Sequence, residues 1–153
     1  MAVEAPLSKY KRNSLLIGIV ACLGMALWFA YDGGFNKEFI AKHTTQQGQP
    51  DSTLAFNQKS PPFFLAGAVL IGVYWCAVRN RKLVAAEDAL VIAGKRRIPY
   101  DTIEKIDKTY FETKGLFTIT YRTEGGKLIQ YKLSDRQYDN LKPILDHLVA
   151  QIT

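Results

Sequence analysis

The sequence predicts an α+β protein, in which a two-helix transmembrane hairpin precedes a small β-sheet or partial-barrel domain closed by a C-terminal amphipathic helix. Three observations predict this class. Two long apolar runs lie within the first 78 residues, and most of the charged residues follow them. Short β-type runs separated by turn residues occupy residues 83–133. Apolar residues at helical spacing then end the chain.

The composition excludes several classes of protein before any motif is considered. Hydrophobic residues make up 48% of the 153 residues and charged residues 22%, which is too apolar for a disordered chain. Two cysteines are too few for a disulfide-stabilised scaffold. A net charge of +6 permits anionic partners without naming one.

Residues 15–31 and 63–78 contain no formally charged side chain. At a rise of about 1.5 Å per residue, each run spans roughly 25 Å of the ~30 Å hydrocarbon core, and the flanking residues supply the rest. We therefore expect a tail at 1–12, a first span at 13–31, an outer loop at 32–61, a second span at 62–78 and a domain at 79–153.

The positive charges predict the orientation of these spans. Lys9, Lys11 and Arg12 precede the first span, and a second basic group follows the other, whereas the charges of the loop at 32–61 cancel. Because Lys and Arg are retained on the cytoplasmic side, both termini should be cytoplasmic and the loop periplasmic in a bacterium.

The spans resemble anchors, because they contain no ionisable residue of the kind that marks an ion or substrate path. Residues 19–22 resemble the lipobox that precedes a lipid-modified cysteine, but the chain stays apolar beyond Cys22. Lipidation of Cys22 and a packing role in the helix pair both remain open. In the loop, His43 has no Cys, Asp or Glu at ligand spacing, so we expect a solvated residue and no metal site.

Six short strands are expected after the second span, at 83–86, 89–93, 96–99, 104–111, 116–122 and 127–133. The last two should form a hairpin across Gly125 and Gly126. The stripe of Leu141, Ile144, Leu145 and Leu148 predicts the closing helix. Pro143 leaves two alternatives, a kinked helix from Ser134 or a main helix that starts near Pro143.

Residues 97–108, with the sequence RIPYDTIEKIDK, look like the "IPYxxIxxID" stretch of bacterial proteins that carry a pleckstrin-homology-like (PH-like) domain beside transmembrane helices. The resemblance covers residues 83–153 and implies a PH-like fold. Eukaryotic relatives bind inositides through basic residues between their first two strands. Here that turn is Glu87-Asp88, so inositide binding is not implied.

No catalytic constellation, cofactor motif or metal-ligand cluster is apparent, and we expect a protein that is not an enzyme. His147 is the only histidine after the second span, with no nucleophile to activate. From residue 79 onward there are 14 Lys and Arg against 10 Asp and Glu. Two basic clusters are candidate contacts for an anionic lipid surface: Arg79, Arg81 and Lys82, and Lys95, Arg96 and Arg97. The first cluster is equally explained as a topology signal.

These features favour a membrane-anchored docking or scaffolding protein, whose domain meets a protein partner or anionic lipid headgroups at the bilayer. The alternative is a small accessory subunit of a larger membrane complex, such as a respiratory or transport assembly. Nucleic acid is not an expected partner, because the charge is modest and no recognition motif occurs.

Overall fold

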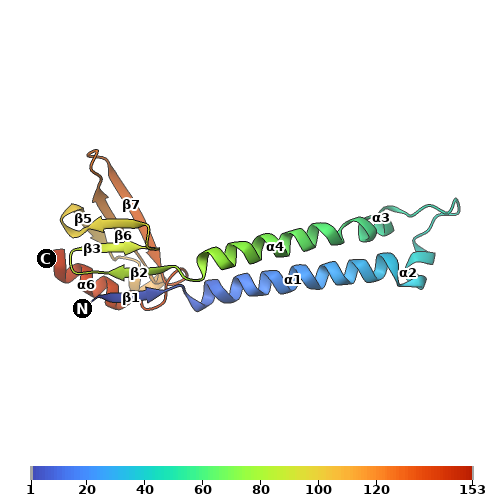
Figure 1. Ribbon diagram of the computed structural model, residues 1–153, viewed down its shortest axis with the longest axis horizontal. Coiled ribbons are helices and arrows are strands. Elements are labelled where there is room, and N and C mark those ends of the chain that lie inside the picture. The colour runs from blue at the N-terminus through green and yellow to red at the C-terminus, as the bar shows by residue number, and fades with distance from the viewer. Residues whose placement is uncertain (1, 153) are drawn as a thin grey trace. The chain divides into compact units, whose positions relative to one another are not determined.

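The computed structural model describes residues 2–152, so the two terminal residues of the expected tail and domain lie outside the described part (Figure 1). The α+β class is confirmed. The chain divides into two compact units. One, here called the sheet unit, contains the residues up to Asn13 and those from Ala77 onward; the other, the helical unit, is Ser14–Cys76.

The sheet unit contains two antiparallel sheets. The first has the strand order β1-β2-β3-β4, and the second has the order β5-β6-β7. Their bounds are Val3–Pro6 (β1), Lys82–Ala85 (β2), Ala89–Ile92 (β3), Arg96–Pro99 (β4), Ile103–Asp107 (β5), Leu116–Arg122 (β6) and Leu128–Ser134 (β7). A short 3-10 turn, η1 (Tyr100–Thr102), joins the sheets. The core between them includes Leu83, Leu90, Ile98, Phe117, Ile119 and Leu133.

Strand β1 corrects the expectation of a tail at residues 1–12. It pairs with β2 in the register Val3↔Ala85 to Pro6↔Lys82, and Ala5 is fully buried in the core. Figure 1 shows β1 alongside β2 at the edge of the sheet. The N-terminal segment and the C-terminal half of the chain are therefore parts of one folded unit.

The predicted hairpin of β6 and β7 is confirmed, with Leu116 opposite Ser134 and Arg122 opposite Leu128. The strand predicted at 104–111 is shorter than expected. It ends at Asp107, and a single helical turn, α5 (Phe111–Lys114), follows. Gly115 ends this turn in the left-handed conformation, with φ of 60°. Glycine adopts this conformation without steric cost, which explains why the chain can turn directly into β6.

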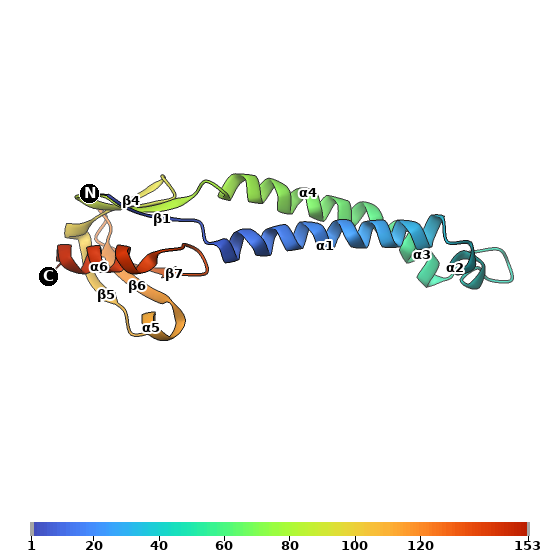
Figure 2. The ribbon, with the colours of Figure 1, turned by 90° about the horizontal axis from the view of Figure 1, so that it is seen from below.

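Helix α6 (Leu141–Ile152) closes the sheet unit (Figure 2). Its predicted stripe is buried at Leu141, Ile144, Leu145 and Leu148, and the helix contacts β1, β2 and η1. The second alternative for Pro143 is correct, because the helix begins at Leu141. Pro143 then lies in the first turn, where a missing amide donor breaks no helical hydrogen bond.

The helical unit holds most of α1 (Lys9–Gly34), followed by α2 (Lys37–Lys42), α3 (Ser52–Lys59) and α4 (Pro61–Val78). Helices α1 and α4 contact each other at small residues. A Cβ atom on Gly18 would lie 3.5 Å from Ile71 Cδ1, and one on Gly67 would lie 3.7 Å from Cys22 Sγ. The glycines thus allow the two helices to approach closely.

Two helices are long and apolar enough to cross a membrane, α1 and the continuous segment Ser52–Val78 that joins α3 to α4. Only 6% and 11% of their most apolar windows are buried. A core helix of a soluble protein would be mostly buried, so these helices do not have that role here.

The expected loop at 32–61 contains two helices. Helix α2 lies within residues 35–42, where the sequence favours a short helical stretch, but α3 was not predicted. Asp51 caps α3, since its Oδ1 accepts a hydrogen bond from the amide of Leu54 at 2.8 Å. Pro61 occupies the first position of α4, as expected of a proline at the start of a helix.

Candidate functional site

The strand register brings the first basic cluster and two residues of the second, Lys95 and Arg96, to one end of the first sheet. Lys82 is the first residue of β2, and its carbonyl accepts a hydrogen bond from the amide of Ala93 at 2.8 Å. The turn that carries Lys95 therefore lies beside the start of β2. Arg96 follows as the first residue of β4, opposite Ile92.

The N-terminal basic residues reach the same end through β1. Pro6 pairs with Lys82, and the Lys82 ammonium forms an ion pair with Glu4 at 2.6 Å. Three residues after Pro6, α1 begins with Lys9. Ser8 is fully buried and fixes this start, because its Oγ donates to the Arg136 carbonyl at 2.6 Å and accepts from the amide of Lys11.

We call this region the basic end of the sheet unit. It is defined by Lys9, Lys11, Arg79, Arg81, Lys82, Lys95 and Arg96. It is also where the chain leaves the sheet unit after Asn13 and returns at Ala77. From the sequence alone, Lys9 and Lys11 are only topology signals, because no sequence pattern shows that residues 3–6 pair with residues 82–85.

Arg97 does not join the basic end. It lies opposite Val91 on β4, and its guanidinium forms an ion pair with Asp88, at the turn between β2 and β3. Arg96 instead places its guanidinium 5.5 Å from the centre of the Tyr131 ring. Adjacent residues of a strand point to opposite faces of the sheet. The sequence alone could therefore have predicted that Arg96 and Arg97 lie on different faces of β4.

His147 in α6 and Tyr100 in η1, two titratable groups, make structural contacts. His147 is half-buried beside Tyr100, and its Nε2 lies 3.4 Å from the Ala86 carbonyl. The Tyr100 hydroxyl donates to the same carbonyl at 2.6 Å, and burial, followed by the charge of Asp88, raises the pKa of this phenol. Within residues 2–152, no cluster of three His, Cys, Asp or Glu side chains could hold a metal ion.

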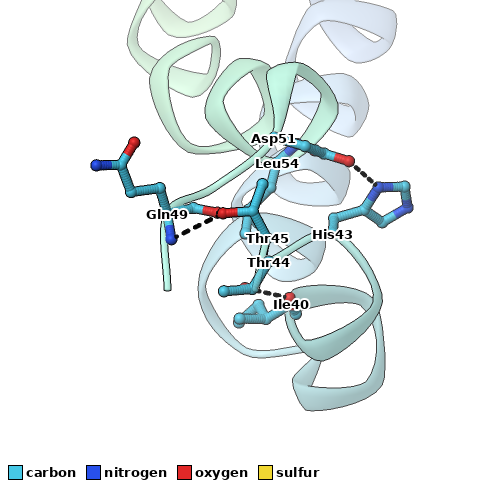
Figure 3. Close-up of polar contacts among 7 residues, drawn as sticks. All are labelled: Ile40, His43, Thr44, Thr45, Gln49, Asp51 and Leu54. Atoms are coloured by element: carbon cyan, nitrogen blue, oxygen red, sulfur yellow. Dashed lines mark hydrogen bonds and ion pairs between the residues drawn. The ribbon is translucent and has the colours of Figure 1, made fainter. Parts of the chain in front are cut away.

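The loop between the long helices is closed by a contact between His43 and Asp51 (Figure 3). His43 Nδ1 lies 2.8 Å from Asp51 Oδ2, and the amide of Asp51 donates to the His43 carbonyl at 2.9 Å. The His43 ring also packs on Phe39. Hydrogen bonds from Leu54 and His43 lower the pKa of the Asp51 carboxyl. His43 was expected to be a solvated residue, but it is half-buried and joins the end of α2 to the start of α3.

Comparison with known proteins identifies no relative. No family model matches the chain, and no curated protein or solved structure is similar to it.

Proposed function

We propose that this protein is a non-enzymatic docking or scaffolding protein of the bacterial inner membrane. Helix α1 and the segment that ends in α4 would be its two membrane spans. The observation that supports them as spans is their exposure: apolar residues such as Val20, Leu27 and Leu70 are each about 70% exposed. A continuous apolar surface of this kind is rare on a soluble monomer and typical of a surface that faces lipid or another protein.

The pairing of β1 with β2 supports the proposed orientation. Because residues 3–6 and residues 82–85 belong to one sheet, both ends of the chain must lie on the same side of any membrane that the helices cross. The basic end, which carries seven Lys and Arg residues, supports a cytoplasmic location for this side, because Lys and Arg are enriched in cytoplasmic segments. The loop with the His43–Asp51 contact would then face the periplasm.

We further propose that the sheet unit is a PH-like domain. Its sheets of four and three antiparallel strands, closed by a C-terminal helix, support the resemblance of residues 97–108 to that family. Two short connections tether the domain at the bilayer: Leu7 and Ser8 before α1, and residues 79–81 after α4. Such a domain would hold a protein partner or an anionic lipid surface close to the membrane, a positional function that needs no catalytic group.

An accessory subunit of a larger membrane complex is the second candidate. Gly24 and Gly72 support it, because a Cβ atom on either would meet no other atom within 4 Å. Small residues on open helix faces are typical contact points for additional transmembrane helices.

The test of these two candidates is the composition of the particle that mild detergent extracts from native membranes. For a docking protein, partners should remain bound when α1 and α4 are exchanged for unrelated spans of equal length. For an accessory subunit, partners should be lost on this exchange but kept when the Lys95 and Arg96 side chains are neutralised. Recovery of the chain in the soluble fraction after a carbonate wash would contradict both candidates.

A further inference from the structure

The basic end contains a small cavity of unusual composition. Its volume is about 120 Å³, and all seven residues that line it belong to the sheet unit: Leu7, Lys11, Val78, Arg81, Tyr131, Gln137 and Tyr138. Val78 and Tyr138 are buried, while Arg81 is exposed to solvent. The sequence gives no sign of this cavity, since its lining comes from three separate segments of the chain.

The polar groups of this lining favour an anion. Lys11 and Arg81 are cations, the two tyrosines and Gln137 can donate hydrogen bonds, and none of the seven residues is a carboxylate. Three other cavities of the sheet unit differ in this respect, because each includes at least one acidic residue, such as Glu112, Glu124 or Glu104. Among the described residues, Arg81 forms no ion pair with a carboxylate, so its charge is not neutralised within the chain.

The groups that line the cavity interact electrostatically. Burial raises the pKa of the Tyr138 phenol, the Tyr131 phenol raises it further, and the charge of Arg81 opposes both. The Arg96 guanidinium lies over the Tyr131 ring and adds a third positive charge at this site. Guanidinium, ammonium and phenol groups around one small space are the donors that a phosphate group prefers.

The size and position of the cavity favour a lipid headgroup over a free small molecule as the source of a phosphate group. At about 120 Å³ the space is well below the ~300 Å³ of a typical small-molecule site, so it suits one polar group of a larger ligand. Lys11 stands four residues before Leu15, where the apolar run of α1 begins, a rise of about 6 Å along the helix. Val78 is the last residue of the apolar helix α4.

From these observations we infer that the cavity binds the phosphate group of an anionic phospholipid, held by Lys11, Arg81 and the two tyrosines. The inference rests on the proposed membrane location. It makes the basic end a specific headgroup site in addition to a topology signal.

Native mass spectrometry of the full chain, with phosphatidylglycerol as the probe, tests this inference. Arg81→Gln should raise the dissociation constant about fivefold, which corresponds to the ~1 kcal/mol that one basic residue contributes near an anionic surface. Arg97→Gln is the matched control, because it removes the same charge from a residue paired with Asp88 away from the cavity. It should change the constant less than twofold. Lys11→Gln provides a second variant, and its effect should match that of Arg81→Gln.

Diacylglycerol with the same acyl chains, which lacks the phosphate group, and inorganic phosphate complete the design. Neither cavity variant should alter the weak binding of diacylglycerol. Equal losses of phosphatidylglycerol in Arg81→Gln and Arg97→Gln would overturn the inference in favour of diffuse surface charge. If Arg81→Gln weakened only inorganic phosphate, the ligand would be a soluble phosphate, which also overturns it. The proposed function fails separately, by release of the wild-type chain from carbonate-washed membranes.

Discussion

Among the glycines of the helical unit, Gly33 is the one with the least space for a side chain. A Cβ atom at this position would lie 2.8 Å from the backbone carbon of Asn57 and 2.9 Å from its oxygen. The Gly33 carbonyl also accepts a hydrogen bond from Gln58 Nε2 at 3.1 Å. Because the nearest atoms are backbone atoms of α3, they can move only if the helix moves.

We therefore predict that Gly33→Ala destabilises the helical unit by about 1–3 kcal/mol, the usual cost of overpacking. Thermal unfolding of the full chain in detergent measures this loss. Gly34→Ala is the matched control, because the neighbouring position has no atom within 4 Å and alanine favours a helix. Equal melting temperatures for the two variants would contradict the close approach of α1 and α3.

Asp51 gives a prediction on pH dependence. Its hydrogen bonds to the Leu54 amide and to His43 lower the pKa of the carboxyl below 3.8 in the folded chain. The carboxylate therefore stabilises the loop fully above the unfolded pKa, and this contribution is lost as the pH falls through the lower, folded pKa. The amide chemical shift of Leu54 should titrate with a midpoint below 3.8.

Asp51→Asn should abolish this titration while it leaves the amide of Leu54 in a helix. A midpoint above 3.8 in the wild-type chain would show that the cap and the His43 contact do not favour the ionised carboxyl.

At the scale of elements, β1 completes the first sheet by pairing with β2. Its alternation places Ala5 in the core with no exposed surface, while Glu4 faces solvent beside Lys82. Ala5→Asp would bury an unpaired carboxylate, a change that costs several kcal/mol. We predict that this variant loses the folded sheet unit.

Limited proteolysis of the full chain measures the effect of Ala5→Asp through cleavage within residues 82–152. Glu4→Gln is the control on the adjacent residue, and it should cost less than about 1 kcal/mol, because it removes only an exposed ion pair. Protection of the Ala5→Asp chain equal to that of the wild type would show that β1 is not needed to complete the sheet.

Elements with local signals could be predicted from the sequence, and elements with distant partners could not. The β6–β7 hairpin has its turn glycines between its strands, and α6 shows its apolar stripe within twelve residues. Strand β1 is only four residues long, and its partner begins 76 residues after its last residue, at Lys82. No local pattern could indicate that pairing.

The candidate site could likewise be predicted only in part, because some of its residues come from segments that are distant in the sequence. The sequence indicates a set of candidate contacts for an anionic surface, and their role stays a prediction: Arg79, Arg81, Lys82, Lys95, Arg96 and Arg97. It could not show that Lys11, Tyr131 and Tyr138 join Arg81 around one cavity, since this depends on β1 and on the turn after β7. Two missed features did have local signals: Asp51 followed by Ser52 and Thr53 is a typical start of a helix, and strand alternation separates Arg96 from Arg97.

At the scale of the whole molecule, the pairing of β1 with β2 would link folding to the membrane insertion that we propose for α1 and α4. The sheet unit is complete only when the residues before α1 and the residues after α4 are in the same compartment. A chain with only one inserted span would separate β1 from β2. The sheet unit of such a chain would expose the buried edge of β2 and the core around Leu83.

The labelling of single cysteines by a membrane-impermeant maleimide in intact cells tests the central claim most directly, in a chain whose Cys22 and Cys76 are replaced by serine. We predict that Gln47→Cys is labelled from outside, whereas Glu4→Cys and Glu124→Cys are labelled only after the membrane is permeabilised. Labelling of Glu4→Cys and Glu124→Cys from opposite sides would contradict the shared sheet, and equal labelling of all three in a soluble fraction would contradict the membrane spans.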